Sequence, residues 1–291
     1  MNHHVGYAAA EVADARLGLR FPLTVLYPTD APARPEAVGP YQLDVARDAP
    51  VRAGQFPLVL VSHGTGSSGL VHRNLAHFLA RHGYVVALPE HPHNNRDDNS
   101  WADTLTNLQA RPRHLQLAID HLLADARWAT ALRPGAIALI GHSLGAYTAL
   151  ALAGGRPQAP RPAPEAGLVA VAVPPADARL RALVLLAPAV PWFQGDGALA
   201  EVHLPVLLLV GERDEHTPPA HARIVRRGLP DAAAVQYREV PNGGHFSFLS
   251  QFPAARISPA FPPSQDPPGF DRARFEGEFH AEVLAFLRRT V

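Results

Sequence analysis

Short runs of mostly apolar residues recur along the chain, and the central ones have the length of buried β-strands. Unbroken apolar runs of this length are typical of parallel strands, because helices cover both faces of a parallel sheet. The early run at 17–27 instead alternates between apolar and polar residues, as a half-buried strand does. The pattern predicts strands at residues 6–14, 17–27, 56–62, 84–88, 136–140, 180–186, 204–210 and 234–240.

Segments with helical periodicity separate these strands. They predict helices at 71–82, 102–109, 111–127 and 220–228, one directly after the strand at 136–140, and one at the end of the chain. Pro112 suits the first turn of its helix, the Thr217 hydroxyl suits a helix cap, and Asp271 suits the cap of the last helix. Strands that alternate with helices predict an α/β fold, with a mainly parallel open sheet of about eight strands and helices on both faces.

The segments between these elements complete the expected organisation. One domain is expected over residues 1–291, with a surface connection at 29–52 and a Pro- and Ala-rich surface excursion at about 154–179. The segment 187–203 is short, so we expect a small lid or none. A Pro-rich loop at about 253–268 either roofs a pocket or is a solvated loop that proline stiffens.

Composition narrows the range of functions. The net charge is zero, so nothing favours nucleic acid or an anionic membrane as a partner. The chain has no Cys, which excludes disulfides and thiol nucleophiles. No run reaches the roughly 18 apolar residues of a membrane span, and the first thirty residues lack the pattern of a secretory signal. A cytoplasmic location without a membrane span is therefore expected, whereas the oligomeric state is not indicated.

The most informative motif is Gly141-His142-Ser143-Leu144-Gly145, which lies between a predicted strand and a predicted helix. In such a G-x-S-x-G elbow the chain turns sharply, and the two glycines remove side chains that would collide. Ser143 is therefore the candidate nucleophile. The backbone N–H of Leu144 lies at the start of the helix, where it would stabilise a developing oxyanion.

A serine hydroxyl needs a base, and the base needs a carboxylate. His245 follows the last predicted strand, which places it at the same edge of a parallel sheet as Ser143. Asp214 lies in the middle of the loop after the strand 204–210 and is the preferred acid, with Glu212 and Glu215 as alternatives. The chain order Ser, Asp, His is the one expected of this architecture.

A second oxyanion donor is expected from the loop after the third strand. This loop, HGTG, follows the strand 56–62, and we assign the donor to the backbone N–H of Thr65. Because the donor is a backbone N–H, the side chain of Thr65 matters less than the conformation of the turn.

These motifs together resemble a known superfamily. The elbow GHSLG, the loop SHGTG, the acid segment GERDEHTPP and the segment PNGGHF resemble the α/β-hydrolases. Within them, SHGTGSS, YVVALPEHPHNN, RPRHLQLAIDHLL and GGHFSFL followed by GFDRARF resemble the dienelactone-hydrolase-like group related to platelet-activating-factor acetylhydrolases. The resemblance runs from about residue 56 to the C-terminal end and implies a Ser/Asp/His hydrolase that acts on ester bonds. Dienelactone hydrolases proper use a Cys nucleophile, whereas this chain has none.

Two further groups of residues allow more than one interpretation. The polar loop after the strand 84–88 could hold a metal or simply border the site, and it carries Glu90, His91, His93, Asp97 and Asp98. Aromatic residues that are candidates for the walls of an acyl pocket, or for ordinary core packing, are Trp192, Phe193, Phe246, Phe248 and Phe252.

The sequence thus predicts a hydrolase that cleaves small-molecule carboxylic esters, without a metal or cofactor. A thioesterase, lactonase or peptidase with the same triad remains open, as does a catalytically silent binding protein of the same fold. A carboxylate nucleophile of the dehalogenase kind is disfavoured, because the elbow carries Ser143.

Overall fold

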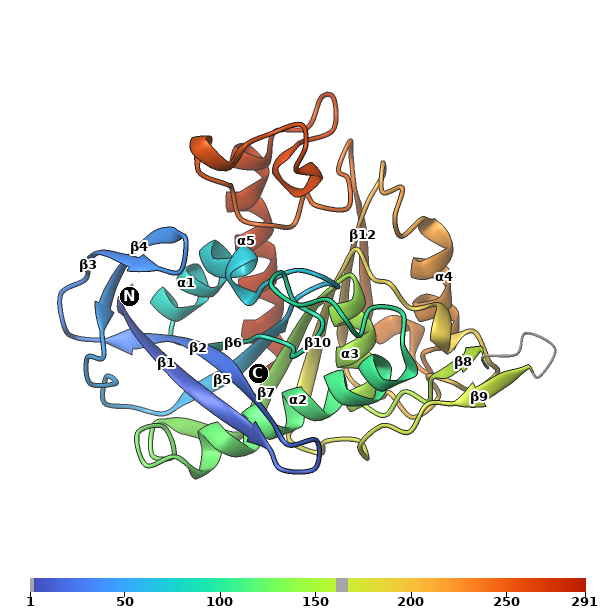
Figure 1. Cartoon of the computed structure of the whole chain (residues 1–291), viewed down its shortest axis with the longest axis horizontal. Coiled ribbons are helices and arrows are strands. Elements are labelled where there is room, and N and C mark those ends of the chain that lie inside the picture. Colours follow the sequence, from blue (N-terminus) through green and yellow to red (C-terminus); the bar gives the residue numbers. More distant parts are fainter. Residues whose placement is uncertain (1–2, 161–166) are drawn as a thin grey trace.

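A ten-stranded sheet runs through the molecule (Figure 1). The computed structural model describes residues 3–160 and 167–291. In chain order the strands of this sheet are β1 (His4–Asp14), β2 (Leu19–Thr29), β3 (Arg34–Val38), β4 (Tyr41–Arg47), β5 (Phe56–Ser62), β6 (Val85–Pro89), β7 (Leu132–His142), β10 (Leu180–Leu186), β11 (Val206–Gly211) and β12 (Val235–Val240). Their spatial order is β12-β11-β10-β7-β5-β6-β2-β1-β4-β3.

The six strands from β12 to β6 are parallel to one another, and the sheet continues through antiparallel pairs of β6 with β2 and β2 with β1. The register pairs Ser62 of β5 with Gly141 of β7, and His142 of β7 with Leu186 of β10. These three strands therefore end together, and the loops that follow them meet at one edge of the sheet.

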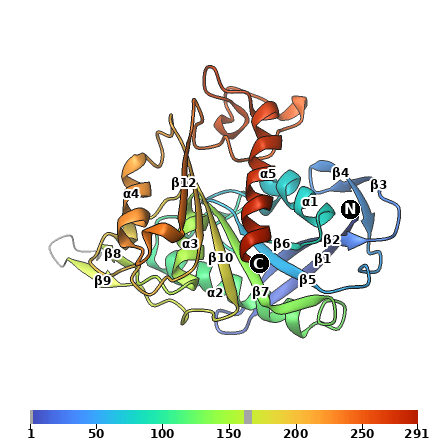
Figure 2. The ribbon, with the colours of Figure 1, turned by 180° about the vertical axis from the view of Figure 1, so that it is seen from behind.

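Helices cover both faces of the sheet (Figures 1 and 2). They are α1 (Arg73–Arg81), α2 (Leu105–Ala124), α3 (Leu144–Leu152), α4 (Pro219–Gly228) and α5 (Arg272–Thr290). The core of α2, α3 and α4 contains Leu58 and Leu60 of β5, whereas the core of α1 and α5 contains Val59 and Val61 of the same strand. Successive residues of β5 thus point alternately to the two helical layers, and both faces of the strand are buried. This burial explains its unbroken apolar run.

Short elements complete the described part of the chain. The 3₁₀ helices are η1 (Gly69–His72), η3 (Pro191–Phe193), η4 (Ala232–Ala234), η5 (Ala254–Arg256) and η6 (Pro262–Ser264). Within the predicted surface excursion at 154–179, β8 (Gln158–Pro160) and β9 (Leu168–Ala170) form a two-stranded sheet, and residues 161–166 lie outside the described residues. No helix in the described ranges is both long and apolar enough to cross a membrane.

The predicted architecture is confirmed, with ten strands instead of about eight. The additional strands β3 and β4 fall within residues 29–52, so the prediction of a surface connection there was wrong. Tyr41, Leu43 and Val45 of β4 are buried, with exposed residues between Tyr41 and Val45. This alternation is the signature of a strand with one buried face. Pro35 lies in β3 at the edge of the sheet, where a missing N–H is tolerated.

The predicted break before Pro112 was also wrong, because α2 is continuous from Leu105 to Ala124. A proline inside a helix leaves the carbonyl four residues earlier without its usual N–H donor. Here that carbonyl belongs to Leu108, and it accepts a hydrogen bond of 2.9 Å from the Tyr147 hydroxyl of α3. A tertiary contact therefore replaces the local bond. At α5 the predicted cap is confirmed, since the Asp271 side chain accepts the N–H of Arg274.

We expect acid to destabilise the fold through buried histidines, and His280 of α5 offers a clean test. Burial against Phe78 and Phe279 lowers the pKa of His280 to about 4. An unfolded chain takes up this proton near pH 6.5, so the folded state loses about 1.4 kcal/mol per pH unit between the two pKa values. His280→Leu should therefore flatten the fall in the free energy of unfolding between about pH 6.5 and 4, as measured by urea titration.

The matched control is His203→Leu, because His203 is exposed. Its stability should fall with acid as steeply as that of the unmodified protein. Equal slopes for His280→Leu and the unmodified protein would contradict the expectation.

Candidate active site

Ser143 occupies a strained turn between β7 and α3. Its backbone has φ 54° and ψ −121°, in the region that favours glycine. A Cβ on Gly145 would lie 1.9 Å from the carbonyl oxygen of Ser62, and a Cβ on Gly141 would lie 2.3 Å from the carbonyl oxygen of Gly145. The two glycines are therefore required by the close approach of three backbones, and Ser143 is held at the tip of the turn.

Asp214 and His245 come together from the loops after β11 and β12. The His245 Nδ1 lies 2.9 Å from one carboxylate oxygen of Asp214 and 3.1 Å from the other. Asp214 also accepts the backbone N–H groups of His216 and Thr217 and the Thr217 hydroxyl, at 2.9, 2.7 and 2.6 Å. The carboxylate is thus fixed from four directions, and its contact with Nδ1 leaves Nε2 as the ring nitrogen of His245 that is available for chemistry.

These hydrogen bonds decide the ionisation of Asp214. Burial alone would raise the pKa of this carboxyl, but the hydrogen bonds and charge of His245 and the hydrogen bonds of Thr217 outweigh it, and the pKa is lowered. Asp214 is therefore an anion at neutral pH. An anion beside Nδ1 stabilises the imidazolium that forms when a histidine takes a proton.

The other two carboxylates of this loop have different positions. Glu212 accepts the backbone N–H of Asn242 at 2.7 Å, which ties the acid loop to the loop that carries His245. Glu215 is exposed. Thr217 does not cap α4 as expected: the cap is Pro218, and the Thr217 hydroxyl is used on Asp214.

Ser143 and His245 line the same cavity of about 400 Å³. Among the described residues the Ser143 hydroxyl has no hydrogen-bond partner, and both side chains are largely buried. The contact between a nucleophile and its base often tightens only when substrate is bound. The arrangement therefore brings a serine hydroxyl and a histidine ring to the same cavity.

The two N–H groups expected to hold an oxyanion also lie at this edge. Thr65 lines the cavity, and Leu144 is the first residue of α3. Neither N–H has an acceptor in the part of the chain that the structure describes. A Cβ on Gly64 would lie 3.2 Å from the Cβ of Ser143, so the loop runs directly beside the elbow.

The cavity walls correct part of the sequence analysis. Phe246 and Phe252 line the cavity, whereas Trp192 and Phe193 do not. The rings of Trp192 and Phe193 lie 5.0 and 5.5 Å from the ring of Tyr147 and belong to the core around α3. Phe248 is likewise in the core, against α5. Ordinary packing accounts for these three.

The Pro-rich loop at 253–268 forms part of the wall. Arg256, Phe261 and Pro263 from this loop line the cavity. The loop is fastened to α5 by Arg272, which forms an ion pair of 2.8 Å with Asp266 and donates 2.9 Å hydrogen bonds to two carbonyls of the loop. Of the two interpretations that the sequence left open, the roof over a pocket agrees with this position.

Polar side chains of the loop after β6 form hydrogen bonds with other groups of the protein. The Glu90 carboxylate accepts the Ser68 hydroxyl at 2.6 Å and the N–H of Gly69 at 2.8 Å. His93 pairs with Asp98 at 2.7 Å. Within residues 3–160 and 167–291, no group of three or more His, Asp or Glu side chains is arranged to hold a metal ion.

Sequence reasoning missed two side chains that support His245. His142, inside the elbow motif, donates from Nε2 to the carbonyl of His245 at 2.9 Å. The Thr217 hydroxyl lies 3.2 Å from Nδ1 of His245 and also donates to Asp214. The G-x-S-x-G motif accepts any residue at the position of His142, and Thr217 lies outside the motif. Only the tertiary structure therefore reveals their contacts with His245.

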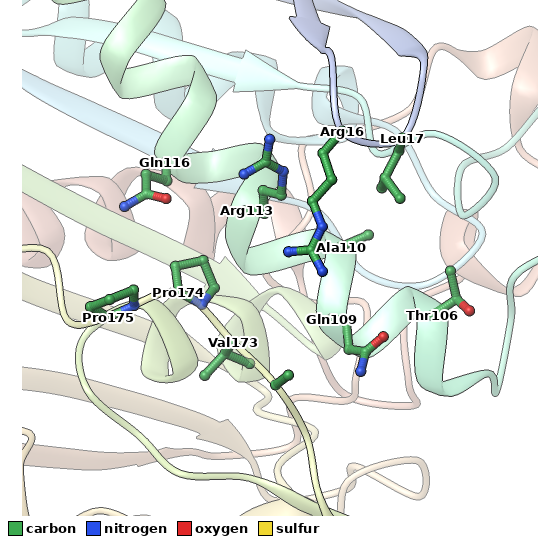
Figure 3. Close-up of a pocket in the computed structure, with 11 residues that line it drawn as sticks. Arg16, Leu17, Thr106, Gln109, Ala110, Arg113, Gln116, Val173, Pro174 and Pro175 are labelled. Carbon is green, nitrogen blue, oxygen red and sulfur yellow. The ribbon is translucent and has the colours of Figure 1, made fainter.

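A second cavity of about 300 Å³ lies between the β1–β2 turn, α2 and residues 172–175 (Figure 3). Arg16 and Gln109 line it, together with Arg113, which forms an ion pair of 2.8 Å with Asp14. None of the residues that line this cavity is a histidine or a carboxylate. It therefore lacks a base, and the candidate active site is the cavity around Ser143.

Comparison with known proteins agrees with the architecture. A family model described as chlorophyllase matches residues 34–182. This range includes Thr65 and Ser143 and ends before Asp214 and His245. No curated protein matches the sequence significantly.

Two solved structures are similar to the chain. A ferulic acid esterase from Streptomyces cinnamoneus aligns with 100% of this chain and 91% of its own, with a TM-score of 0.73 and 21% identity. A dienelactone hydrolase from Anabaena variabilis aligns with 84% of this chain and 89% of its own, with a TM-score of 0.53 and 17% identity. At these identities the likeness establishes the fold, which is that of the α/β-hydrolases.

The close approach at Gly145 predicts that a larger residue at this position destabilises the fold. Gly145→Ala should lower the free energy of unfolding by about 3 kcal/mol or more, because its methyl group would enter the space of the Ser62 carbonyl. The matched control is Gly277→Ala, where a Cβ meets nothing within 4 Å in the middle of α5. That change should stabilise the protein by about 0.5–1 kcal/mol, since alanine is the better helix former. Denaturant unfolding measures both, and equal effects would refute the steric argument.

Proposed function

The chain belongs to the chlorophyllase family, and from this membership we propose that it is a serine hydrolase of carboxylic esters. The observation that carries the proposal is the cavity shared by Ser143, in its strained turn, and His245, whose ring is bonded to the Asp214 carboxylate. A serine hydroxyl, a histidine and a buried anion that is hydrogen-bonded to the histidine are the parts that acyl transfer needs.

In the proposed mechanism, the Nε2 of His245 takes the proton of the Ser143 hydroxyl as the oxygen attacks the ester carbonyl. The N–H groups of Thr65 and Leu144 stabilise the oxyanion. His245 then gives its proton to the departing alcohol, which leaves an acyl group on Ser143. Water activated by the same histidine releases the acid. No step requires a metal or cofactor.

The walls of the cavity favour substrates with an apolar part. Its lining is rich in apolar side chains from one segment of the chain, namely Phe246, Leu249, Phe252 and Phe261. Such a surface binds hydrocarbon or aromatic groups. The esterase and the dienelactone hydrolase that share the fold act on esters and lactones by name, which agrees with this substrate class.

The first test replaces the proposed nucleophile. Ser143→Ala should abolish ester hydrolysis and labelling by a fluorophosphonate probe, because both need the hydroxyl. Ser100→Ala, an exposed serine in the loop after β6, is the control and should retain both. A Ser143→Ala protein that still turns over esters would refute the mechanism. A folded, unmodified protein that is not labelled would favour a silent binding protein. The same assay with thioester, lactone and amide substrates separates the related activities.

The second test changes the wall of the cavity. Phe252→Ala should raise the ratio of kcat/KM for a bulky ester to that for an acetate ester, because removing the ring enlarges the cavity that Ser143 lines. Trp192→Phe should leave this ratio unchanged, since Trp192 packs against Tyr147 outside the cavity. If Trp192→Phe moved the ratio and Phe252→Ala did not, the assignment of the walls would be reversed.

A further inference from the structure

Arg111 of α2 is fully buried behind the loop after β5, which carries Thr65, and it does not line the cavity. Burying a guanidinium is costly unless its N–H groups are all hydrogen-bonded. None of the four groups that accept its hydrogen bonds is a carboxylate. A charge buried without a contacting counter-ion points to a role other than stability.

The first set of contacts fixes the loop after β5. An Nη2 hydrogen bond reaches the carbonyl of His63, and a second of 3.3 Å reaches the Ser62 hydroxyl. Nη1 donates to the side-chain oxygen of Asn94 at 2.6 Å. Asn94 in turn donates to the Thr65 hydroxyl at 2.8 Å. Arg111 therefore holds the loop on both sides of Gly64 and reaches the residue that carries one proposed oxyanion donor.

The second contact fixes the beginning of α3. Nε of Arg111 donates to the Thr148 hydroxyl at 3.0 Å, and this hydroxyl donates to the carbonyl of Leu144 at 2.9 Å. Leu144 carries the other proposed donor. One planar guanidinium is thus linked by hydrogen bonds to both residues of the proposed oxyanion hole, to Thr65 through Asn94 and to Leu144 through Thr148.

Arg111 is positively charged, whereas the histidines around it are neutral. Burial lowers its pKa to about 9, so it stays protonated at neutral pH. Burial, together with the charge of Arg111, lowers the pKa of His63 to about 3, and the pKa of His114 likewise, so these neighbours are neutral. The guanidinium therefore presents a positive charge to the back of the oxyanion hole, in a medium that screens it weakly. Glu90 is the nearby anion, but it does not contact the guanidinium.

We propose that Arg111 is a positioning residue for the oxyanion hole, which fixes the Thr65 and Leu144 N–H groups at one separation and favours negative charge between them. The proposal rests on the proposed serine mechanism. In that mechanism the Ser143 oxygen bonds to the carbonyl carbon, the π electrons move to the carbonyl oxygen, and the serine proton moves to His245. The new oxyanion forms in front of the two N–H groups, so their spacing affects the transition state more than the bound ester.

The test is Arg111→Met, with active sites counted by fluorophosphonate titration. We expect kcat to fall by about 10- to 100-fold while KM changes by less than about threefold. The reason is that misplaced donors reduce the stabilisation of the transition state and leave the binding of the ester nearly unchanged. Inhibition by a trifluoromethyl ketone, which adds to Ser143 and forms an oxyanion, should weaken by a similar factor. Arg111→Lys should be intermediate, because it keeps the charge and loses the planar fork.

The matched control is Arg113→Met. Arg113 lies two positions further along α2, with its guanidinium on Asp14 at the second cavity (Figure 3). Its kcat, KM and ketone affinity should equal those of the unmodified protein. A role in stability alone would instead lower the melting temperature of Arg111→Met and leave kcat per active site unchanged.

A second variant covers the case in which Arg111→Met does not fold. Asn94→Asp keeps an acceptor for Arg111, cannot donate to Thr65, and places a negative charge near the oxyanion, so kcat should fall by about 10-fold or more. If the unmodified protein neither hydrolyses esters nor is labelled at Ser143, the proposed function fails. If it does both, and the folded variants of Arg111 and Asn94 keep kcat within about twofold, the role of Arg111 alone is refuted.

Discussion

The site depends on one steric constraint, the contact between the first turn of α3 and the carboxyl end of β5. No atom larger than hydrogen fits on Gly145 beside the Ser62 carbonyl. This contact forces the chain to turn within a single residue, which gives Ser143 its positive φ. It also brings the loop after β5 against the elbow, so the proposed donors at Thr65 and Leu144 belong to neighbouring backbones. The geometry of the site is therefore a property of backbone packing, and side chains refine it.

Sequence reasoning succeeded where information was local or followed from topology. The central strands were recognisable because an unbroken apolar run reports burial on two faces. His245 and Asp214 could be expected at the edge of the sheet that carries Ser143, because the carboxyl ends of parallel strands share an edge. Their catalytic roles stay a prediction. The errors have a different origin. The alternation of β4 was obscured by the Pro- and Asp-rich segment around it, and the continuity of α2 depends on the Tyr147 hydroxyl, 39 residues beyond the carbonyl that it satisfies.

The same distinction explains why the sequence did not indicate a role for Arg111 and did not decide which candidate aromatic residues line the cavity. An arginine in a helical segment is usually solvated, and nothing nearby in the chain marks this one as buried. Its hydrogen-bond acceptors lie 17 to 49 residues away, on β5, the loop after β5, the loop after β6 and α3. For Trp192 and Phe193 the sequence offered two uses of an aromatic ring. The choice between wall and core depended on where Tyr147 lay.

The fold also separates the proposed chemistry from the walls around it. Ser143, Thr65 and Leu144 belong to the edge of the sheet, whereas Phe246, Leu249, Phe252 and Phe261 follow His245 in one segment. That segment is fastened to α5, through Phe248 against Phe275 and Phe279 and through Arg272 on the Pro-rich loop. A change in these wall residues can therefore alter the shape of the cavity while the close contact at Gly145 stays intact. Under the proposed function, the elbow therefore determines how a bond is broken, and the segment held by α5 determines which substrates fit beside it.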